Sequence, residues 1–197
     1  MEELSFANTL VVSQKKEWGE ILTAFEAKNR YVVQTEHGNE LYHATEEGGS
    51  LLLRWILKGF RPFTIVLRTP DGRPVLRLER PFRFYFQKLD VREDGGKLLG
   101  TVELEFSMLH RIFRVSDGNG SEICQLYGPI LHPWTFQIRQ NGREVGKITK
   151  KWSGLLKEGF TDADNFAAVL PPGMTVQAKG VLLGSVFLID FAYFERR

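Results

Sequence analysis

Short segments in which apolar and polar residues alternate are separated by turn signals along most of the chain. Five such signals recur: His37-Gly38-Asn39, Pro70-Asp71-Gly72, Asp94-Gly95-Gly96, Asp117-Gly118-Asn119-Gly120 and Asn141-Gly142. Between them, Thr101 to Phe106 alternates with a period of two, so Val102, Leu104 and Phe106 are expected to face a core. The spacing of the turns predicts an antiparallel meander.

Two long segments of this meander resemble each other. "YVVQTEHGNELYHA" followed by "RPFTIVLRTPDGRPVLRL" parallels "FRVSDGNGSEICQLYG" followed by "HPWTFQIRQNGREVGKI". The paired elements Pro62-Phe63-Thr64 and Pro133-Trp134-Thr135 favour an internal duplication, and a coincidence among similar hairpins is the alternative.

The C-terminal run "GVLLGSVFLIDFAYF", residues 180–194, is apolar on every helical face. Its length falls short of the ~20 residues that span a bilayer, and it contains Asp190, so a helix buried in the protein is the preferred interpretation. Meandering strands avoid exposed edges by closing into a barrel, and a barrel of about twelve strands is too wide for its own side chains to fill. We therefore predict a mainly β fold, a closed antiparallel barrel around the C-terminal helix.

Composition limits the organisation and the compartment. The 197 residues predict a single domain, 1–197, in which residues 1–30 are a partly peripheral N-terminal segment. The net charge of +2 lacks the cationic excess of a nucleic-acid-binding protein. One cysteine, Cys124, and an N-terminus without an export signal predict a cytoplasmic location.

Four blocks of the sequence resemble the phospholipid scramblase family, whose fold is similar to the tubby-like barrel. They are "RPF" (61–63), "LGTVELEFSMLHRIFRVSDGNG" (99–120), "GREVGKITKKWSGLLKEGFTDADNF" (142–166) and "LLGSVFLIDFAYFE" (182–195). The resemblance implies a barrel of twelve strands around a C-terminal helix, association with the cytoplasmic face of a membrane, and calcium-dependent movement of phospholipids between leaflets.

The resemblance also implies a calcium loop that begins at Asp162. Asp162 and Asp164 fit the first two acidic positions, whereas Phe166 and Ala168 offer only backbone carbonyls, and Gly173 stands where a closing acid is needed. Such a site would bind Ca²⁺ weakly. The alternative is that Thr161 caps a short helix whose first turn holds both aspartates, and that Pro171-Pro172 ends it.

A basic and aromatic strip precedes this loop. It consists of Arg143, Lys147, Lys150, Lys151, Trp152 and Lys157, and it is the candidate site for anionic phospholipid headgroups or a protein partner. Alternation along a strand would place Arg143 and Lys147 on one face and Lys150 on the other. An ordinary solvated strand with a core tryptophan is the alternative. The family's import signal overlaps this region, so a nuclear location is also expected if the cell is eukaryotic.

No arrangement of residues predicts catalysis. His37, His43, His110 and His132 lack the spacing of metal ligands, and Cys124 in a strand is typical of a small core residue. We therefore expect a scramblase-like, membrane-peripheral protein that is not an enzyme. The alternative is a soluble interaction module that binds protein or nucleic-acid partners and has no role in lipid transport.

Overall fold

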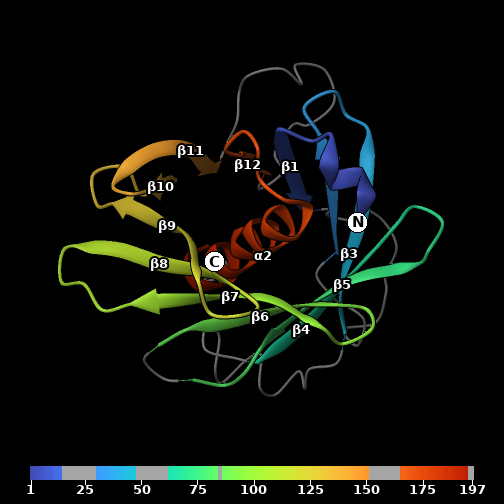
Figure 1. Ribbon diagram of the computed structural model, residues 1–197, viewed down its shortest axis with the longest axis horizontal. Coiled ribbons are helices and arrows are strands. Elements are labelled where there is room, and N and C mark those ends of the chain that lie inside the picture. The colour runs from blue at the N-terminus through green and yellow to red at the C-terminus, as the bar shows by residue number, and fades with distance from the viewer. Residues whose placement is uncertain (15–29, 48–61, 84–85, 151–164, 195–197) are drawn as a thin grey trace, which may run out of the picture.

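The computed structural model describes residues 1–14, 30–47, 62–83, 86–150 and 165–194, and these form a barrel that surrounds one helix (Figure 1). The twelve strands are β1 (Thr9–Gln14), β2 (Arg30–Thr35), β3 (Glu40–Glu47), β4 (Phe63–Arg68), β5 (Pro74–Arg80), β6 (Lys88–Glu93), β7 (Leu98–Glu105), β8 (His110–Asp117), β9 (Glu122–Pro129), β10 (Thr135–Gln140), β11 (Arg143–Lys150) and β12 (Asn165–Val169). A 3₁₀ helix, η1 (Glu2–Ser5), precedes them, and α2 (Val176–Tyr193) follows.

The ring closes because the first strand pairs with the last. Each strand pairs antiparallel with the next, and β1 pairs with β12 from Thr9 opposite Val169 to Ser13 opposite Asn165. The predicted closed antiparallel barrel is thereby confirmed. Since β1 completes the ring, the peripheral position expected for residues 1–30 does not apply to this strand.

The two similar sequence segments occupy strands that lie six positions apart in the ring. The first covers β2 to β5 and the second covers β8 to β11. Matching turns share one geometry, with Gly38 and Gly120 at φ of 82° and 87°. The β6–β7 turn, outside both segments, has the same geometry at Gly96, so turn type alone is no evidence for a duplication. The offset of half a ring is what favours duplication.

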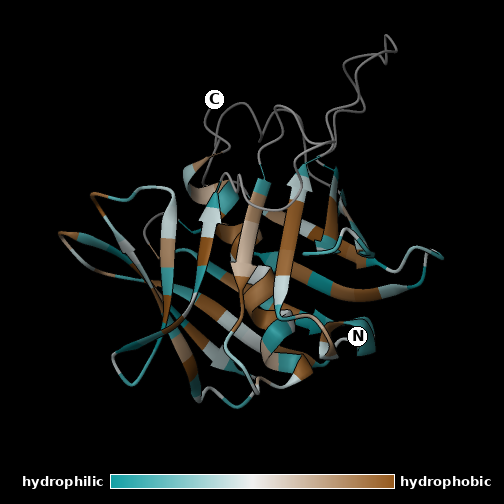
Figure 2. Ribbon diagram, turned by 90° about the horizontal axis from the view of Figure 1, so that it is seen from above, coloured by the Kyte–Doolittle hydropathy of each residue, from teal (hydrophilic) through white to brown (hydrophobic). Residues whose placement is uncertain are grey.

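Apolar and polar residues alternate along the strands because successive side chains face opposite sides of the ring (Figure 2). Val102 is fully buried, as predicted, and Leu104 packs partly against the core. Phe106 was expected to face the core as well. This expectation is wrong: β7 ends at Glu105, and Phe106 is 79% exposed in the connection that follows.

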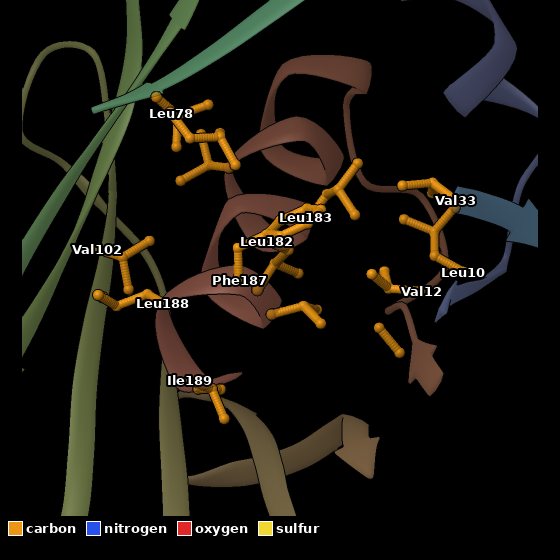
Figure 3. Packing of buried hydrophobic residues seen from close by; sticks show 14 of the residues in the cluster. Leu10, Val12, Val33, Leu78, Val102, Leu182, Leu183, Phe187, Leu188 and Ile189 are labelled. Carbon is orange, nitrogen blue, oxygen red and sulfur yellow. The ribbon is translucent and has the colours of Figure 1, made fainter. Parts of the chain in front are cut away.

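The interior is filled by α2, whose residues from Ala178 to Ala192 are all buried. Leu182, Leu183, Phe187, Leu188 and Ile189 point in different directions around the helix and meet strand residues such as Leu10, Leu78 and Val102 (Figure 3). A helix without a polar face needs apolar contacts on every side, and the closed ring provides them. The predicted buried helix is confirmed.

The length argument for burial needs correction. The helix has 18 residues, and by length and composition it is the one described helix that could cross a membrane, although 83% of it is buried. It starts four residues earlier than the apolar run because Thr175 accepts a hydrogen bond from the backbone N–H of Ala178 and caps it. The helix differs from a membrane anchor in its burial inside the ring, and not in its length.

Lys179 fastens the N-terminal segment to the start of α2. Its Nζ donates to the carbonyl oxygens of Leu4, Ser5 and Ala7 at 3.0, 3.0 and 2.7 Å, which uses all three of its protons. Burial lowers the pKa of this ammonium group, and the three carbonyls compensate for the water it has lost. Residues 4–7 are thereby held over one end of the barrel.

Two glycines of α2 make a matched test of how tightly the ring encloses the helix. A Cβ at Gly184 would lie 2.7 Å from Val91 Cγ2, whereas at Gly180 the nearest atom is 3.6 Å away. We expect Gly184→Ala to lower the free energy of unfolding by about 1–3 kcal/mol through overpacking. Gly180→Ala should be neutral or should raise it by up to ~1 kcal/mol through helix propensity. Urea unfolding measures both, and equal effects would contradict this packing.

Candidate functional site

The two ends of the barrel are built differently. In an antiparallel meander, alternate connections fall at alternate ends. One end, here called the hairpin end, carries the tight turns after β2, β4, β6, β8 and β10, together with η1. The other, here called the loop end, carries connections 81–87, 106–109 and 130–134, the strand ends that flank residues 15–29, 48–61 and 151–164, and the C-terminus of α2.

A buried ion pair lies inside the barrel near the loop end. Lys150 Nζ is 3.7 Å from Asp190 Oδ1, and Tyr31 donates its hydroxyl to Asp190 Oδ2 at 3.0 Å. Asp190 lies in the last turn of α2, where unpaired carbonyls disfavour a negative charge. The cation from β11 and the hydroxyl from β2 therefore offset both the helix dipole and the loss of water.

Aromatic rings cover this ion pair. Phe194 stacks on Trp134 with centroids 5.1 Å apart, and the Lys150 Nζ lies 4.1 Å from the Phe194 centroid. Phe166 from β12 adds a second ring, 5.3 Å from the same nitrogen. Cation–π attraction is strengthened where water is excluded, so these contacts help to hold the Lys150 side chain inside the barrel.

Arg111, at the start of β8, organises the connection between β9 and β10. Its guanidinium donates to the carbonyl oxygens of Pro133 at 2.9 Å, Pro129 at 3.3 Å and His132 at 3.5 Å. The same group lies over the rings of Phe136 and Tyr193. Burial lowers the pKa of Arg111, which remains a cation at neutral pH because an arginine starts from such a high value.

A pocket of about 430 Å³ opens beside Arg111 at the loop end. Its lining combines apolar groups with a few polar ones: Phe86, Leu104, Glu105, Phe106, Ser107, His110, Arg111 and Tyr193. Apolar walls with one cation and one carboxylate favour an amphipathic ligand over a strongly charged one.

Comparison with known proteins places this geometry in a family. A family model described as Scramblase matches residues 1–196. The chain belongs to the scramblase family. Phospholipid scramblase 1 of Mus musculus is 33% identical over the whole chain, which spans 64% of that protein's length. Phospholipid scramblase 2 of Homo sapiens is 31% identical, with 70% of its length covered.

A likeness in structure accompanies the match in sequence. An X-ray structure of a protein from Arabidopsis thaliana superposes with a TM-score of 0.51 at 16% identity, covering 93% of this chain and 90% of that one. At this level of identity the likeness concerns the fold alone. The scramblase family is thus identified from sequence, and the likeness in fold from the structural comparison.

The basic strip of this scramblase-family protein is divided by the alternation of β11. Arg143 and Lys147 are exposed, whereas Lys150 is 5% exposed and points inward to Asp190. Lys150 was predicted as a lipid or partner contact, and that assignment is wrong because its charge is already used inside the barrel. Lys151, Trp152 and Lys157 lie outside the described residues.

The residues of the implied calcium loop are also divided. Asp162 and Asp164 lie outside the described residues, but Phe166 and Ala168 belong to β12 and pair with β1 and β11. A strand that is paired on both sides does not wrap around an ion, so these two carbonyls are corrected from loop ligands to ladder positions. The alternative of a helix that continues to Pro171 is equally wrong, since residues 165–169 are extended.

Two further expectations concern metals and nucleophiles. No group of three or more His, Cys, Asp or Glu side chains that could hold a metal ion occurs among the described residues. Cys124 is fully buried, and desolvation raises the pKa of its thiol to about 12, so it is not a thiolate at neutral pH.

Sequence reasoning missed the roles of Tyr31, Arg111 and Asp190. The available signal was Asp190, an acid inside an otherwise apolar run, because a buried carboxylate requires a nearby cation. Which cation could not be deduced, since Lys150 and Tyr31 reach Asp190 only after the ring has closed. Arg111 gave no local signal at all.

The ion pair can be tested by a double-mutant cycle with Lys150→Met and Asp190→Asn. Removing one partner of a buried pair should lower the free energy of unfolding by about 3–5 kcal/mol. The double variant should lose less than the sum of the single losses by at least ~1 kcal/mol, because neither charge remains. Asp190→Asn keeps an oxygen for Tyr31. Strictly additive losses in urea unfolding would show that the two charges do not interact.

Proposed function

We propose that this protein is peripheral to the inner, cytoplasmic face of a membrane, binds anionic phospholipids there, and mediates the movement of phospholipids between leaflets. Membership of the scramblase family over nearly the whole chain is the observation that carries this proposal. The curated relatives are named phospholipid scramblases, and they are longer than this chain. A nuclear location in a eukaryotic cell is part of the same proposal.

The geometry supports a mechanism at the barrel surface. The interior is occupied by α2, and the ion pair and the Lys179 contacts fix the two ends of this helix. A headgroup therefore has no route through the described interior. Lipid binding at the exterior of the loop end, with the barrel intact, agrees with this arrangement, and the amphipathic pocket beside Arg111 lies there.

Weak calcium dependence through Asp162 and Asp164 stays part of the proposal. It is carried by the family resemblance and the two carboxylates, with ligands other than the carbonyls of Phe166 and Ala168. A soluble module that binds protein or nucleic-acid partners is the other candidate function. It is favoured only by the burial, inside the barrel, of most of the helix that could otherwise act as an anchor.

A reconstituted assay tests the function. Vesicles that carry a fluorescent phospholipid in both leaflets are incubated with the full chain in the presence of calcium or of a chelator, and dithionite bleaches the outer leaflet. We expect more than half of the fluorescence to be lost only when the protein is present, and faster with calcium. Asp162→Ala/Asp164→Ala should remove the calcium response and leave flotation with vesicles intact. Protein that neither floats nor exposes lipid would favour the soluble module.

The remaining exposed residues of the strip predict a graded effect of charge reversal. Lys147→Glu should weaken binding to phosphatidylserine vesicles about fivefold or more, since one basic residue near an anionic surface contributes about 1 kcal/mol and the new acid is repelled. Arg143→Glu should have less effect. Arg143 starts β11 beside the hairpin turn, so it lies about 13 Å further from the loop end than Lys147 does. This extra distance exceeds one Debye length, so salt screens its attraction to the membrane.

Arg73→Glu, at an exposed turn of the hairpin end, is the control for the same change in charge. Binding is measured by co-flotation at low and physiological salt. Equal losses for Arg143 and Lys147 would place both at the membrane, and no loss for either would remove β11 from the lipid contact.

A further inference from the structure

Exposed large apolar side chains gather at one end of the barrel. Among the described residues, nine such side chains are exposed, and eight of them belong to connections 81–87, 106–109 and 130–134 of the loop end. Leu131, Met108 and Phe106 are 88%, 87% and 79% exposed. The ninth, Phe6, lies at the hairpin end. Single exposed apolar residues are ordinary, but such segregation to one end marks an interaction surface.

The three connections are neighbours in the ring. They join β5 to β6, β7 to β8 and β9 to β10, and the intervening pairs β6–β7 and β8–β9 are hydrogen-bonded along their length. His110 at the start of β8 is opposite Pro129 at the end of β9, so the second connection ends beside the point where the third begins. The apolar side chains therefore form one continuous rim, not three separate spots.

Hydrogen bonds hold two of these connections, 106–109 and 130–134, in place. Besides the three bonds from Arg111, the backbone N–H of His132 donates to Pro129 O at 3.2 Å, and that of Thr135 donates to His132 O at 3.0 Å. In the neighbouring connection, the N–H of His110 donates to Ser107 Oγ at 3.1 Å. The apolar tips are displayed by ordered backbone, which lowers the entropic cost of binding.

The three connections also differ from the hairpin turns in charge. The sequences of the three connections contain Arg83 and His132 but no Asp or Glu. The turns of the hairpin end mix acids with bases: they contain Glu36, Asp71 and Asp94 together with Arg73 and Lys97. Three connections with apolar tips, a cation and no carboxylates match an anionic bilayer, which attracts the cation and accepts apolar groups without requiring a complementary shape. A protein partner would need a concave surface fitted to three projecting connections.

We propose that the loop end is a membrane-docking surface, in which Phe86, Phe106, Met108, Leu109, Ile130 and Leu131 insert into the boundary between headgroups and acyl chains. This inference rests on the proposed phospholipid function, and it adds the surface and the orientation. The C-terminal end of α2 then faces the bilayer, and the hairpin end faces the aqueous phase. Insertion of loop tips reaches about 5–10 Å, which leaves the strands outside the hydrocarbon.

A depth probe tests the orientation. Leu131→Cys and Phe6→Cys each place an exposed thiol at one end of the full chain, whereas the native Cys124 stays unlabelled because it is fully buried. Each variant is labelled with an environment-sensitive dye and mixed with phosphatidylcholine vesicles, with and without phosphatidylserine and spin-labelled lipid. We expect a blue shift and quenching by the spin label at Leu131→Cys, and neither change at Phe6→Cys.

Substitution of the rim gives a second readout. Met108→Ser/Leu131→Ser should reduce co-flotation roughly tenfold or more, since each side chain loses a favourable transfer out of water. Phe6→Ser, at a residue of equal exposure, should bind as the unmodified protein does. All three positions are on the surface, so thermal unfolding should stay within a few degrees.

The possible outcomes distinguish a failure of the docking surface from a failure of the proposed phospholipid function. Vesicle binding with an unquenched probe at Leu131→Cys would overturn the docking surface and leave the lipid function standing. Absence of vesicle binding at every composition would overturn both. A probe at Leu131→Cys that is shielded without lipid, together with a doubled mass in light scattering, would assign the rim to a second copy of the chain and overturn membrane docking.

Discussion

The structure depends on filling the interior of a closed ring of twelve strands. Strand side chains alone do not fill a ring of this width, and a hollow interior would leave its apolar lining without contacts. The helix α2 supplies them because apolar residues occur on all its faces. Neither element is stable without the other: the helix would expose an apolar surface to water, and the ring would enclose a void.

This dependence explains where the two charged residues of α2 lie. Lys179 and Asp190 are on the first and last turns of α2, and each is compensated by groups from the barrel. Lys179 draws carbonyls of residues 4–7 across the hairpin end, while Asp190 meets Lys150 and Tyr31 near the loop end. Both contacts require one axial position of the helix, so they fix its depth in the ring. The close approach of Gly184 to Val91 opposes a shift of the helix as well.

The sequence predicted those features that depend on local pattern. Turn glycines and period-two alternation gave the meander, and the all-apolar run gave the buried helix. The prediction failed where a local pattern ended without a signal: Phe106 continues the alternation of β7 but lies beyond its last ladder position. Lys150 shows the converse. Its charge indicated a surface residue, and only closure of the ring shows that its partner is 40 residues later in the chain.

The filled barrel also constrains how phospholipids could cross a membrane. The eight large apolar side chains buried on α2 contribute roughly 12–24 kcal/mol when they are removed from water, which equals or exceeds the whole stability of a typical domain. Withdrawal into water would therefore unfold the protein. Withdrawal into hydrocarbon would keep most of that energy, but Lys179 and Asp190 are about 17 Å apart along the helix, so both charged side chains would start from within a core about 30 Å thick. Both would also lose their partners in the barrel. A rim that perturbs lipid packing from the surface avoids these costs, and it leaves intact the ring that holds the rim together.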